Sequence, residues 1–207
     1  MPMLRPILLM CALGLPACGA GIEAGRAAPQ SAGDASRQER EELFRLGRRA
    51  AARGDSVRAE QYLSLAIERG YPKDRALPVL LQVCLGGSRL RAALDHAQPY
   101  LDQHPNQDAL RFLVANIHLG LGQNNQARAE LDTLLRRSPR FEEALFLRAV
   151  LGMSSDAEAA RTDLRSYLEV TPHGLHAAEA RSRLSELAVR EPARETALRT
   201  NLSRVTR

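Results

Sequence analysis

The chain has 207 residues, of which 44% are hydrophobic and only 4% aromatic, and its formal net charge is +5. This length allows a buried core in one or two domains, and the abundance of Ala, Leu, Arg and Glu favours helices over sheet. The arginines alternate with glutamates and form no basic block interleaved with aromatic residues, which argues against a nucleic-acid-binding protein. We therefore expect no nucleic-acid partner.

Residues 1–17 have the pattern of an export signal. A single positive residue precedes an apolar stretch at 6–15 that is too short to cross a bilayer as a helix, and the run LPAC follows at 15–18. This segment resembles a bacterial lipoprotein signal peptide, which is cut before a cysteine whose thiol then carries a diacylglycerol. Pro16 departs from that motif. The alternative is an ordinary secretory signal in which Cys18 is incidental.

The lipoprotein resemblance implies a location as well as a modification. Acyl chains contribute roughly 0.8 kcal/mol per buried methylene, so lipidated Cys18 would hold the protein on a membrane without a transmembrane helix. The residue directly after Cys18 is Gly19 and not Asp. By the same resemblance, the lack of Asp there implies sorting to the outer membrane, with the domain at its periplasmic face. Without lipidation the protein would be secreted to the periplasm.

The rest of the chain divides into three parts by composition. Residues 18–38 are small and polar and predict a flexible tether with a reach of roughly 25 Å. A helical domain with a closing helix is expected over 39–190, followed by a polar tail at 191–207. Once the signal is removed and Cys18 lipidated, Cys84 has no disulfide partner, and we expect it to be a small core residue.

A sequence pattern with a period of 34 residues runs through the domain. Its four frames begin at Arg40, Asp74, Asp108 and Glu142. Small residues recur at position 20, namely Ala59, Ala93, Ala127 and, in a fourth unit that is one residue shorter, Ala160. Prolines mark the ends of the units at Pro72, Pro105, Pro139 and Pro172. Small residues let two antiparallel helices approach closely, and proline cannot continue a helix.

This pattern resembles the tetratricopeptide repeat (TPR) over about residues 40–172. The resemblance implies an all-α fold, a right-handed α-solenoid of about four TPR helix hairpins plus a C-terminal cap helix, in which each hairpin covers the apolar face of its neighbour. The family's aromatic positions 4 and 11 depart from the pattern, since the third unit has Arg111 and His118 there.

The faces between units provide an internal check on this assignment. In the third unit the positions that should pack on the preceding hairpin are all apolar, whereas the first unit, with no predecessor, has Arg49 and Arg53 among them. Arg148 interrupts the same face in the fourth unit, and we expect its apolar stem to lie along the surface. The closing helix at 173–190 has one apolar stripe, made of Ala177, Ala180, Leu184 and Leu187.

Candidate catalytic or metal-binding residues are sparse. The five histidines are His96, His104, His118, His173 and His176. His173 and His176 are three residues apart with no Cys or carboxylate beside them at ligand spacing, and His118 is expected to be a satisfied interior histidine. No phosphate-binding loop, HExxH or GxSxG motif occurs. We therefore predict no enzyme activity, cofactor or metal.

The best functional signal is the inner surface that the resemblance implies, where the first helix of each hairpin lines a groove. The residues expected there are Phe44, Arg48, Gln82, Leu85, Phe112, Asn116, Leu119 and Phe146. Such a surface, with an apolar floor, aromatic residues and a polar ladder, suits an apolar helix or an extended segment. The alternative is that the phenylalanines pack between adjacent helices as core.

These features predict a membrane-anchored adaptor that binds another envelope protein and positions it or helps to assemble a complex. The combination of lipobox and repeats resembles the pilotins, which bring secretin subunits of type IV pilus or secretion systems to the outer membrane. Two alternatives remain open, a self-associating structural scaffold and a regulatory partner of a peptidoglycan enzyme. The oligomeric state does not follow from the sequence.

Overall fold

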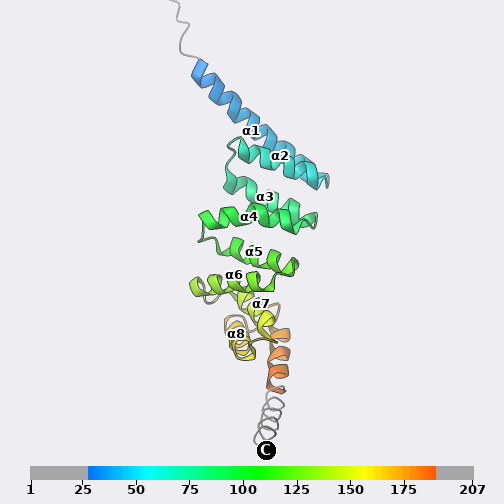
Figure 1. The fold of residues 1–207 in the computed structure, drawn as a ribbon, viewed down its shortest axis with the longest axis vertical. Coiled ribbons are helices and arrows are strands. Elements are labelled where there is room, and N and C mark those ends of the chain that lie inside the picture. Colours follow the sequence, from blue (N-terminus) through cyan, green and yellow to red (C-terminus); the bar gives the residue numbers. More distant parts are fainter. Residues whose placement is uncertain (1–27, 190–207) are drawn as a thin grey trace, which may run out of the picture. The chain divides into compact units, whose positions relative to one another are not determined.

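The computed structural model describes residues 28–189, and every regular element within that range is helical (Figure 1). The helices are α1 (Ala28–Ala52), α2 (Ser56–Glu68), α3 (Lys73–Gly86), α4 (Leu90–Gln103), α5 (Asp108–Gly120), α6 (Asn124–Arg137), α7 (Glu142–Gly152) and α8 (Ala157–Val170). A further helix occupies 177–189. The predicted all-α repeat fold, with four hairpins and a closing helix, is confirmed.

The chain divides at Glu39 and Arg40 into two units, and the repeats belong to the second. From α2 to α8, each helix packs against the next one in the sequence, and Gly47 of α1 faces Leu63 of α2 (Figure 1). The α3, α5 and α7 helices begin at Lys73, Asp108 and Glu142, within one residue of the expected frame. The 34-residue period is therefore the period of the stacked hairpins.

Close approach of paired helices depends on the small residues of the repeat. The alanines at position 20 are all essentially inaccessible: Ala59, Ala93 and Ala127 are 0% exposed and Ala160 is 1% exposed. At Gly47 the approach is closer still, because a Cβ built there would lie 2.7 Å from the Cγ atom of Leu63 and 3.3 Å from the carbonyl oxygen of Ala59. A larger residue at that point would have to displace the Leu63 side chain.

The turns between helices follow from local sequence. Gly54 and Gly122, each between two paired helices, have φ angles of +77° and +73°, which glycine adopts at little cost. Asp55 and Asp156 cap α2 and α8, because their side chains accept hydrogen bonds from the backbone N–H groups of Arg58 and Ala159. These signals end and restart helices where the pattern predicted.

One boundary prediction was wrong. Helix α1 begins at Ala28, so residues 28–38 are helical although the sequence indicated a flexible tether over 18–38. Side chains at 33–39 are all exposed, which explains why no apolar periodicity marked them. Alanine, glutamine, arginine and glutamate propagate a helix readily once a packed segment has nucleated it. Residues 1–27 and 190–207, with Cys18 and the predicted tail, lie outside the described residues.

The faces between hairpins behave as the sequence predicted. Val114 and Ile117, on the third unit's stacking face, are 0% and 1% exposed, whereas Arg49 and Arg53 of the first unit are exposed. The closing helix buries Ala177, Ala180 and Leu187 and partly buries Leu184. It begins at 177 rather than 173, because a turn joined by hydrogen bonds such as Gly174 N–H to Thr171 precedes it.

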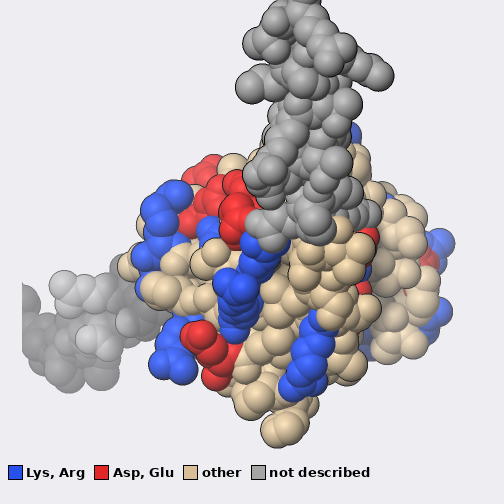
Figure 2. Space-filling view, turned by 90° about the horizontal axis from the view of Figure 1, so that it is seen from below, with Lys and Arg blue, Asp and Glu red and all other residues tan. Residues whose placement is uncertain are grey.

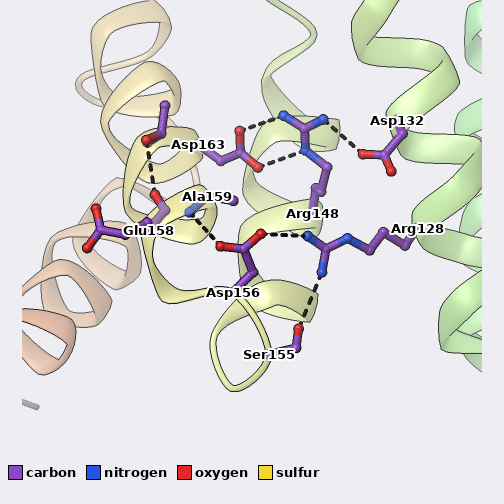
Figure 3. A network of polar contacts seen from close by, with 9 residues as sticks. Arg128, Asp132, Arg148, Ser155, Asp156, Glu158, Ala159 and Asp163 are labelled. Atoms are coloured by element: carbon purple, nitrogen blue, oxygen red, sulfur yellow. Dashed lines mark hydrogen bonds and ion pairs between the residues drawn. The ribbon is translucent and has the colours of Figure 1, made fainter. Parts of the chain in front are cut away.

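Arg148 has a different role from the one expected. Its guanidinium donates two hydrogen bonds to Asp163 of α8, at 2.8 and 2.7 Å, and one to Asp132 of α6, at 3.0 Å (Figure 3). Hydrogen bonds to Asp163, with its charge and that of Asp132, raise the pKa of Arg148 despite the opposing effect of burial. The arginine on α7 thus ties together three helices from two hairpins.

Arg111 and His118, which replace the family's aromatic residues at positions 4 and 11, also make polar contacts. Arg111, which is 9% exposed, donates to Glu130 at 2.5 Å and to the carbonyl oxygen of Pro105 at 3.2 Å. The Nδ1 atom of His118 lies 2.7 Å from the side-chain oxygen of Gln123. At each of these two positions a hydrogen bond between α5 and a neighbouring segment stands in place of aromatic packing. His118 is the satisfied interior histidine that was predicted.

Candidate binding grooves on the inner helices

The first groove lies between α1 and α3 and has a volume of about 610 Å³. Its walls come from the first helices of two successive hairpins and from the turn after α1. The lining residues are Phe44, Arg48, Ala51, Ala52, Gly54, Ser56, Val79, Gln82, Val83, Gly86 and Gly87. The floor is mostly apolar, and Arg48 is the one charged residue among those that line it.

The second groove adjoins the first on the other side of α3. It lies mainly between α3 and α5 and has a volume of about 780 Å³. Its lining residues are Asp74, Leu77, Pro78, Leu81, Gln82, Leu85, Gly86, Tyr100, Gln107, Ala109, Leu110 and Leu113. Gln82 and Gly86 line both grooves, so the two form adjacent compartments with the α3 residues at their shared edge. Both volumes lie within the range of clefts that bind ligands.

The two compartments differ in charge. Arg48 is the charged residue of the first groove and Asp74 that of the second. Pro78, inside α3, has no N–H, so the Asp74 carbonyl does not form the usual helical hydrogen bond to the residue four positions later. The second groove presents the Asp74 carboxylate as an acceptor, whereas the first presents the Arg48 guanidinium as a donor. Gln82, with both an acceptor and a donor, stands between them.

Comparison with known proteins agrees with this geometry. Residues 85–151 match the model of the tetratricopeptide repeat family. Several solved structures superpose on most of the described hairpins. In its fold, the chain is a tetratricopeptide-repeat solenoid.

Three of those structures illustrate the likeness. A tetratricopeptide repeat protein from Parabacteroides merdae ATCC 43184 is 24% identical, covering 82% of this chain and 68% of its own, with a TM-score of 0.66. YrrB, described as having an unusual peptide-binding site, is 17% identical, with 72% and 76% coverage and a TM-score of 0.59. MamA from Desulfovibrio magneticus RS-1 is 15% identical, with 80% and 92% coverage and a TM-score of 0.60. No curated protein matches the sequence.

The tetratricopeptide solenoid brings together only half of the groove residues that the sequence singled out. Phe44, Arg48, Gln82 and Leu85 line the two grooves. The remaining four line neither of them: Phe112, Asn116, Leu119 and Phe146. Partner binding by all eight remains a prediction.

The phenylalanines divide between groove and core. Phe146 is only 8% exposed and stacks on His176 with ring centroids 4.2 Å apart, so it is core and not an open aromatic contact. Phe112 is half-buried against Phe141, at a centroid distance of 5.4 Å. Phe44 stacks on Tyr71 at 4.3 Å and also lines the first groove. Phe146 is covered by Tyr167 of α8 and by His176 in the turn before the closing helix, which the 34-residue spacing did not reveal.

Several groove residues were missed by the sequence reasoning. Val79 and Leu113 occupy position 6 of their repeats, and Leu110 occupies position 3. The predicted groove residues all occupy positions 5, 9 and 12 of the repeat, whereas a groove between neighbouring inner helices is also lined by residues that face across the gap. Tyr100 reaches the second groove from α4, and no periodic signal within the inner helices identified it.

The face drawn in Figure 2 shows no concentration of charge of one sign. In the view of Figure 2, basic, acidic and uncharged side chains are interspersed, and the basic ones do not merge into one patch. Among the described residues, no helix combines the length and apolar character needed to cross a bilayer. The two adjoining grooves are therefore the best candidate site on the described part of the chain.

Proposed function

We propose that the protein is a membrane-anchored adaptor that binds a segment of another envelope protein in the adjoining grooves and positions it for assembly, as pilotins do. The observation that carries the proposal is the pair of apolar compartments meeting at Gln82, one with Arg48 and the other with Asp74. A binding protein needs such a concave apolar surface with a few placed polar groups.

The grooves suit a particular kind of segment. Its apolar side chains would occupy the two compartments, with an acidic group near Arg48 and an N–H donor or basic group near Asp74. The Gln82 amide can hydrogen-bond a backbone running between them. Peptide binding by YrrB, which has a similar fold, supports this mode of recognition.

The anchoring part of the proposal rests on the sequence alone. The run LPAC at 15–18 after an apolar stretch supports lipidation of Cys18 and a location at the periplasmic face of the outer membrane. A lipidated adaptor would keep its client at that membrane, which is what assembly of a secretin requires. Metabolic labelling with a palmitate analogue tests this part separately, since Cys18→Ser should abolish the label.

Photo-crosslinking in cells tests the partner. A photoreactive residue at Gln82 should capture an envelope protein, whereas the same residue at exposed Gln61, which lines neither groove, should not. Capture of a secretin supports the pilotin-like role. Capture of a second copy of this chain would favour a scaffold, and capture of a peptidoglycan enzyme would favour a regulatory role. Equal capture at both positions would refute the groove as the binding site.

Charge reversal tests the polarity of the segment. Arg48→Glu and Asp74→Lys should each reduce capture at Gln82, because each opposes a charge of the partner and leaves the apolar floor unchanged. Both side chains are exposed, so the fold should be retained, and circular dichroism checks this. Unchanged capture in both variants would contradict the proposed orientation.

A further inference from the structure

A second cluster of reactive side chains lies outside the two grooves. Glu60 of α2, Cys84 of α3 and His96 of α4 each direct one potential ligand atom to a common point, with all three atoms within 4.8 Å of one another. The Nε2 atom of His96 lies 3.1 Å from the Oε1 atom of Glu60. Three consecutive helices from two hairpins therefore converge on a carboxylate, a thiol and an imidazole.

The surroundings of this cluster combine a buried end with an open one. Cys84 is 0% exposed, whereas the side chains of Glu60 and His96 are 16% and 28% exposed, so solvent reaches the cluster past the histidine. Arg89 forms an ion pair with the Glu60 carboxylate. The Oε2 atom of Glu60 and the Nη1 atom of Arg89 are nevertheless buried without a well-aligned hydrogen bond. One oxygen of the Glu60 carboxylate is thus held by Arg89, and the other faces the imidazole of His96.

We propose that Glu60, Cys84 and His96 bind a divalent transition-metal ion, Zn²⁺ being the best fit, with a water molecule as the fourth ligand. Thiolate, imidazole and carboxylate are the three side-chain ligand types of zinc, and soft sulfur disfavours Mg²⁺ and Ca²⁺. Two anionic ligands balance the ion's charge. Arg89 would remain on the second carboxylate oxygen and orient it, as outer partners of metal ligands do.

The geometry requires a small adjustment. Zinc bonds of about 2.0–2.3 Å place tetrahedral ligand atoms about 3.3–3.8 Å apart. The three potential ligand atoms here lie within 4.8 Å of one another, so they must move slightly closer together. His96 is the most exposed of the three and can change its rotamer without repacking the core. The imidazole and the Glu60 carboxylate are already 3.1 Å apart, so binding an ion requires side-chain torsions that bring these two groups and the Cys84 thiol to bonding distance.

Binding of the ion has a proton balance. The metal ligand is the thiolate, so one thiol proton is released to solvent for each ion bound. Burial and then the charge of Glu60 raise the pKa of Cys84 to about 11, against the opposing effect of Arg89. The Cys84 thiol of the metal-free site is consequently protonated at neutral pH, and binding of an ion displaces that proton.

Titration of the purified, reduced full chain with Co²⁺ tests this site without relying on the partner of the grooves. A cobalt–thiolate charge-transfer band should saturate at one ion per chain, and Zn²⁺ should displace it. The band should persist in Cys11→Ser/Cys18→Ser, which lacks the two N-terminal thiols, and disappear in Cys84→Ala. His96→Gln should weaken Co²⁺ binding by about tenfold or more, whereas the surface control His104→Gln should not.

Thermal unfolding gives an independent readout. Stoichiometric Zn²⁺ should raise the melting temperature of the wild-type chain, and a chelator should reverse the shift, because an ion that binds only the folded state stabilises it. The proposal is overturned if no charge-transfer band forms, if the band survives in Cys84→Ala, or if His96→Gln binds Co²⁺ as tightly as the wild type. Failure of these tests would leave the groove proposal untouched.

Discussion

Replacement of Arg148 by methionine should reveal how strongly the last two hairpins depend on one guanidinium. Methionine keeps most of the apolar stem but removes the three hydrogen bonds to Asp163 and Asp132. The consequence is asymmetric. The side chain of Asp132 is 38% exposed and regains water, whereas that of Asp163 is 7% exposed and is left as a buried carboxylate without its cation.

The magnitude follows from this burial. Removing one partner of a buried ion pair costs about 3–5 kcal/mol, because the remaining charge stays desolvated. The Arg148 side chain is 25% exposed, so water moderates the loss. We expect Arg148→Met to lower the free energy of unfolding by about 2–4 kcal/mol, which combines that buried-pair cost with partial screening.

A matched control comes from the same region (Figure 3). Arg128 pairs with Asp156 at 3.5 Å, and the two side chains are 31% and 48% exposed. Arg128→Met should therefore cost only about 0–1 kcal/mol, as exposed pairs do. The double variant Arg148→Met/Asp163→Leu, which removes the orphaned carboxylate too, should regain much of the loss.

Urea unfolding followed by circular dichroism measures all of these variants, provided that the dependence on urea concentration keeps the same slope. Added salt should shrink the effect of Arg128→Met more than that of Arg148→Met, since exposed pairs are screened more strongly. The reasoning is refuted if the two arginine variants lose equal stability, or if the double variant is less stable than Arg148→Met.

Three further predictions test other parts of the fold. Gly47→Ala should be less stable than Gly86→Ala by about 1–3 kcal/mol. The new methyl group at position 47 would lie 2.7 Å from the Cγ atom of Leu63, whereas nothing lies within 4 Å of one at position 86. Equal urea midpoints for the two variants would contradict this. Burial raises the pKa of Cys84 from 9.0 to about 11, so the folded state keeps its thiol proton at a pH where the unfolded chain loses it. The free energy of unfolding of the wild-type chain should therefore be unaffected by this group below pH 9 and should fall by about 2 kcal/mol between pH 9 and 11. Unfolding curves of Cys84→Ala should not show this loss. Asp55→Ala should cost about 1 kcal/mol through loss of the α2 cap, measured by the shift in melting temperature against Asp55→Asn, which retains an acceptor.

Much of the fold follows from local features that the sequence displays directly. The small residues at position 20, of which Ala59 and Ala93 are examples, predicted where paired helices meet, and both are fully buried. The helix starts were predictable because proline, glycine and capping residues act within one or two turns. The extension of α1 back to Ala28 was missed, because an exposed helical segment has no apolar periodicity to reveal it.

The candidate sites depended on the tertiary structure to a greater degree. Repeat spacing identified Phe44 and Phe146 as equivalent. Only Phe146 is buried, because Tyr167 and His176 pack against its ring, and what covers a residue is decided by its neighbours in space. Arg148 was without an explanation until α6 and α8 supplied its carboxylates.

The sequence by itself therefore determined the repeat, its helices and the face on which a groove forms. Only the packing of one hairpin on the next decided which groove residues remain open. It also decided that Glu60, Cys84 and His96, which share no motif, direct their ligand atoms to one point. Periodicity records the contacts that every repeat makes, whereas a site is built from the contacts that one repeat makes and the others do not.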